Sequence, residues 1–248
     1  MARIGLQLYS IKELTESDFL GTIEKVARVG YDGVEFAGYF NTKAKDLRNC
    51  LAAAGIEAAG SHIGIDALRE GLDACIEYSN EINSPYIIVP YIPEEMRNSL
   101  DAYKATAEEF DKIGEKCRKN GILFGYHNHE FEFEKFDGEF GLDLLVNYTA
   151  PENLFIELDT YWVEYSRLKS VDFVNKYKGR CKILHIKDMK SLEDTENTEI
   201  GKGIMDFKGI TAASLAYNPE WFTVEQEAFE IPQLQSIEES LRYLKGIL

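Results

Sequence analysis

The chain has 248 residues, of which 45% are hydrophobic, and its 43 acidic and 27 basic residues give a formal net charge of −16 at pH 7. This charge repels polyphosphate backbones, so we expect no nucleic acid partner. No stretch is apolar and long enough to cross a bilayer, and the first residues enter a strand-like segment without a signal peptide. We therefore expect a cytoplasmic protein with no membrane partner, and the composition leaves a homo-oligomer open.

Short apolar runs with the composition of buried strands alternate with amphipathic stretches along the whole chain. The clearest helix covers residues 104–119, where apolar and small residues recur at three- and four-residue spacing and Asn120-Gly121 follows as a helix end. The predicted strands, in chain order, are 3–9, 33–36, 57–61, 86–90, 123–128, 154–159, 182–186 and 222–227.

Eight strands that alternate with helices require a parallel sheet, and this length is usual for one closed barrel. The sequence therefore predicts an α/β protein with a single (β/α)8 TIM barrel domain over residues 1–248. A doubly wound open sheet is the alternative. It is disfavoured because Gln7-Leu8-Tyr9-Ser10, after the first strand, contains no glycine-rich phosphate loop.

The four cysteines predict neither a zinc knuckle nor a disulfide framework. Cys50, Cys75, Cys117 and Cys181 are widely spaced and form no CxxC pair. We expect them to be reduced and mostly buried.

The ends of the predicted strands carry polar residues, including all four histidines of the chain. In a barrel of this class the chemistry lies at the carboxyl ends of the strands. A carboxylate or imidazole at the end of a buried strand needs a partner, and one cation satisfies several such groups together. The strand-end set is Gln7, Tyr9, Glu35, His62, Pro90, Tyr91, His127, His129, Glu132, Asp159, Trp162, His185, Lys187, Asp188, Glu225 and Glu227.

Simpler structural roles exist for some of these residues. Glu35 and His62 are typical of polar residues that find hydrogen-bond partners at the start of a loop, and Asp159 is also placed to turn the chain or to cap the next element.

Carboxylates combined with imidazoles favour Mn²⁺, Mg²⁺, Co²⁺ or Zn²⁺ as the bound metal ion. Such an ion polarises a sugar carbonyl or holds an enediolate, while flanking carboxylates transfer protons. The strand-end pattern therefore predicts an enzyme that acts on a small carbohydrate.

The motifs, taken in order, resemble one family. They are residues 5–10, 33–36, 126–133 (Tyr-His-Asn-His-Glu-Phe-Glu-Phe), 158–162, 185–188 (His-Ile-Lys-Asp), 201–207 and 224–227. Together they resemble the xylose isomerase-like TIM barrels of the sugar phosphate isomerase/epimerase superfamily. The end of the fifth strand, with its two histidines, resembles the histidine-rich strand end of inosose dehydratase-like members.

The resemblance implies a metal site. It assigns Asp159, His185 and Glu225 as ligands, while His127 stands where the epimerases have a glutamate. Either His127 is the fourth ligand, or Glu132 reaches back to the metal and His127 contacts the substrate. We favour His127 as the ligand.

The remaining roles follow from the same resemblance and from the strand-end positions. We assign proton transfer to Glu132, Glu225 and His129, with Glu132 as an acid/base or a contact to a substrate hydroxyl. The expected substrate contacts are Tyr9, Glu35, His62, Trp162, Lys187 and Glu227.

The predicted function is a divalent-metal-dependent isomerase or epimerase of a sugar or sugar phosphate, acting through proton abstraction next to a carbonyl and a metal-stabilised enediolate. A lyase or dehydratase that eliminates from a keto-sugar or inosose is the first alternative, because the fifth-strand ligand has changed. A non-catalytic barrel that binds a small carbohydrate is the second. An endonuclease for abasic DNA, also found in this superfamily, is disfavoured by the acidic charge and by only four histidines.

The loop 199–207 contains Gly201-Lys202-Gly203, which is not a phosphate-binding P-loop. We expect its glycines to make a tight turn and Asp206 to cap the next helix. The alternative is that Lys202 approaches an anionic group of the substrate.

Overall fold

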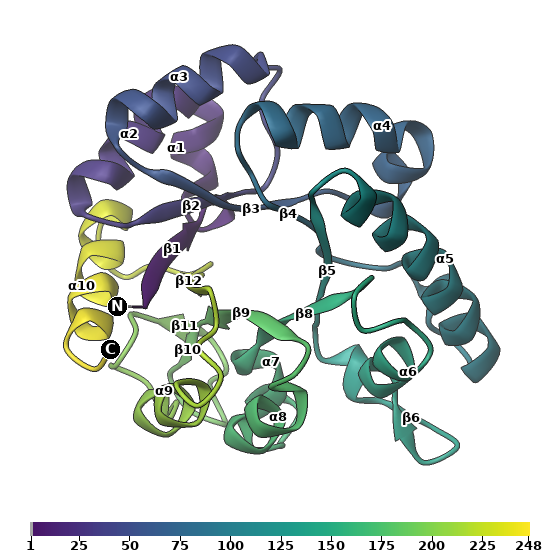
Figure 1. Cartoon of the computed structure of the whole chain (residues 1–248). Helices are drawn as coiled ribbons and strands as arrows, with labels where there is room; N and C mark the ends of the chain where they lie inside the picture. The colour runs from purple at the N-terminus through teal and green to yellow at the C-terminus, as the bar shows by residue number, and fades with distance from the viewer. Residues whose placement is uncertain (1) are drawn as a thin grey trace.

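A computed structural model describes residues 2–248, and within this range eight parallel strands form a closed barrel (Figure 1). The predicted (β/α)8 barrel is therefore confirmed, and the open sheet is excluded because β1 pairs with both β2 and β12. The barrel strands are β1 (Arg3–Gln7), β2 (Gly33–Phe36), β3 (Glu57–His62), β4 (Tyr86–Val89), β5 (Leu123–His127), β8 (Phe155–Asp159), β9 (Cys181–Ile186) and β12 (Trp221–Val224).

The helices surround the barrel, as Figure 1 shows. None of them, within residues 2–248, is long and apolar enough to span a bilayer. Two short antiparallel pairs, β6 (Lys135–Phe136) with β7 (Glu139–Phe140) and β10 (Asp188–Met189) with β11 (Asn197–Thr198), lie in the loops. The helices are α1 (Lys12–Ser17), α2 (Phe19–Val29), α3 (Ala44–Ala54), α4 (Ile65–Glu81), α5 (Leu100–Lys119), α6 (Gly141–Asn147), α7 (Thr160–Tyr165), α8 (Ser170–Tyr177), α9 (Phe207–Ser214) and α10 (Gln233–Lys245).

Side-chain caps explain two of the predicted element bounds that were wrong. Helix α5 begins at Leu100, before the expected residue 104, because the Ser99 hydroxyl accepts a hydrogen bond from the Ala102 N–H. Strand β1 ends at Gln7, because the Gln7 side chain accepts from the Tyr9 N–H and residues 8–11 form a 3₁₀-helix. Strand β12 ends at Val224, three residues before the expected end.

Aromatic side chains fill the amino-terminal half of the barrel interior. Trp221, Tyr86 and Phe155 stand at the first positions of their strands and are almost completely buried. Gly33 and Gly125 make room for them, because a Cβ would lie 2.5 Å from the Trp221 ring and 2.4 Å from the Phe155 ring, respectively. This apolar plug leaves the inward-facing positions near the carboxyl ends to polar side chains.

The strand register brings those polar side chains together. Gln7 lies beside Glu35, His127 beside Glu157, and Asp159 beside His185. Side chains at matched positions of neighbouring parallel strands point to the same face of the sheet. Residues far apart in the sequence therefore meet in one layer at the carboxyl end of the barrel.

The four cysteines are free, with Cys117 and Cys181 buried and Cys50 and Cys75 partly exposed. Half of the thiols, and not most of them as expected, are therefore buried.

Candidate functional site

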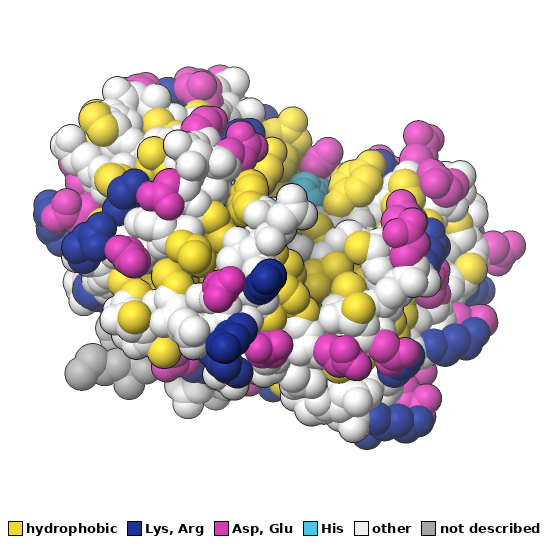
Figure 2. Space-filling model, turned by 90° about the horizontal axis from the view of Figure 1, so that it is seen from above, with side chains coloured by type: hydrophobic (Ala, Val, Ile, Leu, Met, Phe, Trp, Pro, Cys, Tyr) yellow, Lys and Arg dark blue, Asp and Glu magenta, His cyan; other side chains and the backbone are white. Residues whose placement is uncertain are grey.

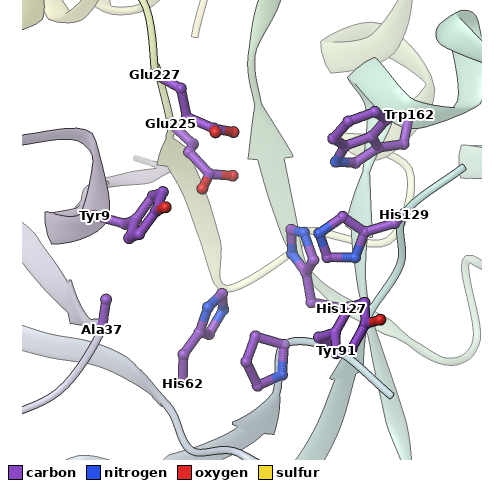
Figure 3. A pocket seen from close by; sticks show the side chains of 10 residues that line it. Tyr9, Ala37, His62, Tyr91, His127, His129, Trp162, Glu225 and Glu227 are labelled. Carbon is purple, nitrogen blue, oxygen red and sulfur yellow. The ribbon is translucent and has the colours of Figure 1, made fainter. Parts of the chain in front are cut away.

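A cavity of about 350 Å³ opens at the carboxyl ends of the barrel strands (Figure 3). On the face shown in Figure 2, a histidine lies in a depression of the surface between hydrophobic side chains, and acidic and basic side chains are scattered around it. Apart from Ala37, the lining belongs to the strand-end set predicted from the sequence. The lining residues are Tyr9, Ala37, His62, Pro90, Tyr91, His127, His129, Trp162, Glu225 and Glu227.

Four buried side chains at the floor of this cavity form a candidate metal site. One ligand atom from each of His127, Asp159, His185 and Glu225 lies within 4.8 Å of the others. His127 Nε2 is 3.7 Å from Asp159 Oδ2, and His185 Nδ1 is 3.1 Å from Glu225 Oε2. The four residues expected to bind the metal are therefore brought together.

Asp159 has two different oxygens. Its Oδ1 accepts a hydrogen bond of 2.8 Å from the Tyr161 N–H and so caps α7, as the structural alternative expected. Its Oδ2 is buried and finds no hydrogen-bond partner within residues 2–248. A buried carboxylate oxygen without a donor is unfavourable, and a divalent cation is a partner that satisfies it. The donor set of two carboxylates and two imidazoles fits such an ion.

Burial and neighbouring charges set the protonation of these groups. Burial raises the pKa of Asp159 to about 7 and lowers the pKa of His127 to about 4. Burial would also raise the pKa of Glu225, but the Lys187 ammonium and the hydrogen bond with His185 outweigh it and hold that pKa well below its usual range. Thus His127 is neutral and Glu225 ionised at neutral pH, as ligands of a cation must be. Asp159 is partly protonated there, and Glu157 and Glu35 raise the pKa of His185 well above its usual range, so these two ligands lose a proton when a cation binds.

Lys187 is 98% buried beneath the cavity wall and does not line it. Its Nζ pairs with Glu227 and lies 5.1 and 5.2 Å from the ring centres of Tyr161 and Trp162. The expected direct contact of Lys187 with the substrate is therefore not what the structure favours, because the ammonium is already engaged by a carboxylate.

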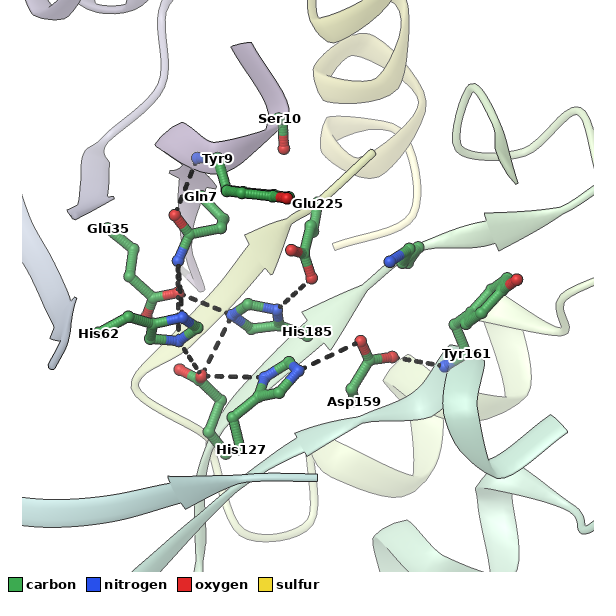
Figure 4. A network of polar contacts seen from close by, with 12 residues as sticks. Gln7, Tyr9, Ser10, Glu35, His62, His127, Asp159, Tyr161, His185 and Glu225 are labelled. Atoms are coloured by element: carbon green, nitrogen blue, oxygen red, sulfur yellow. Dashed lines mark hydrogen bonds and ion pairs between the residues drawn. The ribbon is translucent and has the colours of Figure 1, made fainter. Parts of the chain in front are cut away.

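A second polar layer contacts the histidines of the metal cluster (Figure 4). Glu35 Oε2 accepts a hydrogen bond from Gln7 Nε2 at 2.6 Å and lies 2.8 Å from His185 Nε2. His62 Nε2 lies 2.7 Å from Glu157 Oε2, and His127 Nδ1 lies 3.2 Å from the same oxygen. Glu35, expected at the substrate, is thus fully buried behind His185, whereas His62 reaches the cavity wall.

Glu157 and Gln7 also belong to this layer, although neither has a role predicted from the sequence. The signal was present for Glu157, because it stands two residues before Asp159 in the same strand and shares its face. Gln7 was in the strand-end set, and its amide was not connected to Glu35 or His62.

The structure places Glu132 outside the cavity. Its Oε1 accepts a hydrogen bond of 2.5 Å from the Tyr126 hydroxyl and its Oε2 one of 2.7 Å from the His129 N–H. Burial raises the pKa of Glu132 to about 8. The carboxylate is not part of the metal cluster, so a direct contact with metal or substrate, expected from the sequence, differs from this placement.

His129 lines the cavity within an aromatic wall. Its ring stacks on Phe131 with centres 5.4 Å apart and lies 5.4 Å from the ring of Trp162. Burial lowers the pKa of His129 to about 2, so its imidazole is neutral, and its Nδ1 has no hydrogen-bond partner within residues 2–248. Tyr9 stands on the other side of the cavity and is 42% exposed, as a side chain that contacts a ligand requires.

The loop after β9 is occupied by internal contacts. Asp206 Oδ1 accepts from the Gly209 N–H and caps α9, which confirms that expectation. Lys202 Nζ pairs with Glu239 at 2.6 Å and Glu199 at 3.3 Å, and is not part of the cavity. The alternative role of Lys202 at a substrate anion is not supported by this geometry.

Comparison with known proteins gives consistent matches. The family model described as "Xylose isomerase-like TIM barrel" matches residues 23–247. An inosose dehydratase of Clostridium beijerinckii is 22% identical over 86% of this chain and 83% of its own length. A solved sugar phosphate isomerase/epimerase from Parabacteroides distasonis is 26% identical, with a TM-score of 0.84 over 99% of this chain and 94% of that one.

A further solved structure has the same fold at 11% identity. It is a protein called IOLI, described with a bound zinc atom, and it superposes with a TM-score of 0.79 over 99% of this chain and 97% of that chain.

Proposed function

The chain belongs to the xylose isomerase-like TIM barrel family, and from this premise we propose that it is a divalent-metal-dependent isomerase or epimerase of a small sugar. The observation that carries the proposal is the buried quartet of His127, Asp159, His185 and Glu225, with Asp159 Oδ2 unpartnered within residues 2–248. Two imidazoles in this quartet favour Mn²⁺, Co²⁺ or Zn²⁺ over Mg²⁺.

When bound, the cation supplies a Lewis acid that polarises the substrate carbonyl. Glu225 lines the cavity and is kept ionised by Lys187, so it is the group that removes a proton from the carbon next to that carbonyl. His129 faces the cavity with a neutral imidazole and holds a substrate hydroxyl. Glu132 is a positioning residue, because it accepts the backbone N–H of His129.

The arrangement of carboxylates bears on the type of reaction. Among residues 2–248, the carboxylates that line the cavity are Glu225 and Glu227. Both follow β12 in the sequence and lie on one side of the cavity (Figure 3). Inversion at a carbon requires proton transfer on two opposite faces, whereas an aldose–ketose isomerisation needs one base that returns the proton to the neighbouring carbon. The geometry thus supports isomerisation more than epimerisation between two carboxylates.

Elimination is the second candidate, and the same one-sided geometry supports it. Proton abstraction by Glu225 followed by loss of a leaving group from the next carbon needs no second carboxylate. The similarity to inosose dehydratases, whose name describes loss of water, points in the same direction.

The cavity wall favours a sugar without a phosphate group. Within residues 2–248 no lysine or arginine lines the cavity, and Lys187 is engaged by Glu227. Two cations approach lining aromatics from outside: Lys12 Nζ is 3.4 Å from the Tyr9 hydroxyl, and the Arg97 guanidinium is 5.9 Å from the centre of the Tyr91 ring. The aromatic walls are suited to the apolar face of a sugar ring.

The test begins with metal analysis of the purified protein and continues with the chelated protein reloaded with Mn²⁺, Co²⁺, Zn²⁺ or Mg²⁺. Ketoses, inososes and 3-keto glycosides, each with its phosphate where one exists, are incubated in deuterated water. Deuterium at carbon without loss of a group supports isomerisation, and an enone product supports elimination. A protein that binds no divalent cation and exchanges no deuterium contradicts the proposal.

A matched pair of variants separates the metal cluster from the rest of the cavity wall. Glu225→Gln removes the proposed base and also replaces one oxygen of a proposed ligand, and it should abolish deuterium exchange. Glu227→Gln changes a neighbouring carboxylate outside the cluster and should keep metal stoichiometry. Equal exchange in wild type and Glu225→Gln would exclude Glu225 as the base.

A further inference from the structure

Glu157 occupies an unusual position, because one of its oxygens meets three imidazole rings. Its Oε2 lies 2.7 Å from His62 Nε2, 3.2 Å from His127 Nδ1 and 3.3 Å from His185 Nε2. Glu157 is fully buried. Neutral imidazole has one donor nitrogen and one acceptor nitrogen, so a carboxylate beside one nitrogen decides which of the two carries the proton.

The orientation of His62 follows from a chain of donors that starts at the backbone. Gln7 Oε1 accepts from the Tyr9 N–H at 3.0 Å, and this contact turns Gln7 Nε2 towards Glu35 and His62. Gln7 Nε2 donates to His62 Nδ1 at 3.3 Å. His62 therefore carries its proton on Nε2 and donates it to Glu157.

The contact with Glu157 also fixes the tautomer of His127. Its Nδ1 is the nitrogen beside Glu157, so Nδ1 carries the proton and the lone pair lies on Nε2. Nε2 is the nitrogen that faces Asp159 Oδ2, at 3.7 Å, across the metal cluster. His185 is held in the matching way, with Nε2 2.8 Å from Glu35 Oε2 and Nδ1 towards Glu225.

We propose that Glu157 is a positioning residue that holds His127 with its Nε2 lone pair aimed at the cation, and that it supports His185 from the same oxygen. The inference rests on the proposed metal-dependent function. A histidine ligand whose second nitrogen donates to a carboxylate is fixed in tautomer and ring orientation and is a more basic ligand. In this assignment Glu157 is not a ligand, although His62, His127, Glu157 and His185 also bring one ligand atom each within 4.8 Å of one another.

The first test uses the wild-type protein and the ring nitrogens themselves. The chain has only four histidines, so long-range ¹H–¹⁵N spectra of the ¹⁵N-labelled protein at pH 7 resolve each tautomer, with assignments from His62→Gln and His129→Gln. His127 is expected to be protonated at Nδ1 and His62 at Nε2. On adding Zn²⁺, His127 Nε2 shifts while its Nδ1–H remains. His127 protonated at Nε2 would overturn the proposal.

The second test compares Glu157→Gln with Thr223→Val. Thr223 lies beside His185 in register, is fully buried, and its hydroxyl has no hydrogen-bond partner within residues 2–248. Glu157→Gln should lower Zn²⁺ affinity about 10–100-fold in a chelator competition and change the visible absorption spectrum of the Co²⁺-loaded protein. Thr223→Val should leave both unchanged.

The outcomes separate this inference from the proposed function. Equal Zn²⁺ affinity and equal Co²⁺ spectra in Glu157→Gln and wild type would overturn the role of Glu157. This result would not contradict the proposed metal site. No cation binding by the wild type would overturn both. Circular dichroism reports whether Glu157→Gln folds, and if it does not, the tautomers of the wild type decide.

Discussion

Replacing Asp159 by asparagine should have two opposite effects that only a metal ligand explains. Asparagine keeps Oδ1, so the hydrogen bond from the Tyr161 N–H and the cap of α7 are retained. It replaces Oδ2, which faces the cluster, by an amide NH₂ that cannot bind a cation. The variant should therefore lose metal binding, while its metal-free form should be more stable than the metal-free wild type.

The magnitude follows from the pKa of Asp159, which burial raises from 3.8 to about 7. At 1.36 kcal/mol per pKa unit, ionised Asp159 destabilises the metal-free fold by about 4 kcal/mol at most. The folded state binds the proton more tightly than the unfolded state, so this penalty is absent below pH 4 and complete above pH 7. An unsatisfied buried amide in the variant costs about 1–3 kcal/mol, which leaves a net gain of about 1–3 kcal/mol.

The assay is thermal and urea unfolding of both chelated proteins between pH 4 and pH 8, repeated with Zn²⁺. For a chain of this size the gain corresponds to a rise in Tm of roughly 2–12 °C at pH 8, which should shrink as the pH falls to 4. Zn²⁺ should raise the Tm of the wild type only, because a ligand stabilises the state that binds it. A metal-free Asp159→Asn protein less stable than wild type at pH 8, or one that binds Zn²⁺ equally well, would show that Asp159 is not a metal ligand.

The other predictions concern the surroundings of the site. Lys187→Met should lower the free energy of unfolding by about 2–3 kcal/mol in urea titrations, less than the loss of a fully buried pair because Glu227 is 44% exposed; no loss would contradict the ion pair. Gly33→Ala places a methyl group 2.5 Å from an interior indole ring and should destabilise by about 1–3 kcal/mol. Trp162→Ala should raise KM for the sugar that exchanges deuterium and leave Zn²⁺ affinity unchanged, and an unchanged KM would remove Trp162 from the sugar contact. Zn²⁺ binding at pH 6 should release protons, because Glu157 and Glu35 outweigh the effect of burial and raise the pKa of His185 well above its usual range; calorimetry in buffers of different ionisation enthalpy measures this release.

The fold was predictable because the spacing of apolar residues indicates each buried strand and each amphipathic helix. Each barrel strand reads as a short apolar run, and β2 has the predicted bounds, residues 33–36. Two of the bounds that failed depend on single side chains: the Ser99 hydroxyl starts α5 and the Gln7 amide ends β1. Both are capping contacts, and periodicity carries no information about which polar side chain makes them.

The candidate metal site was predictable as a set because the carboxyl ends of the parallel strands meet at one end of the barrel. Glu157 could have been added to this set by the same argument, because side chains two residues apart along β8 share a face and Asp159 lies on that face. Glu132 was not. It lies in the 3₁₀-helix Phe131–Phe133, and its carboxylate turns back to β5, where Tyr126 donates to it. The path of a loop after a strand end depends on tertiary contacts that a sequence pattern does not encode.

The polar layer also bears on the alternative of a non-catalytic barrel. Glu35 Oε1, Glu157 Oε1 and Asp159 Oδ2 are buried without a hydrogen-bond partner within residues 2–248. Each such group destabilises a fold by about 1–3 kcal/mol, and well-packed apolar residues in place of buried charges are often neutral or stabilising. The aromatic plug of Trp221, Tyr86 and Phe155 shows that the same barrel accommodates an apolar interior at its other end. A barrel with no ligand to bind gains nothing from the charged layer, whereas a barrel that holds a cation needs carboxylates and oriented imidazoles at this position. The placement of the unfavourable groups beneath the cavity therefore favours a cation-dependent activity over a scaffold role.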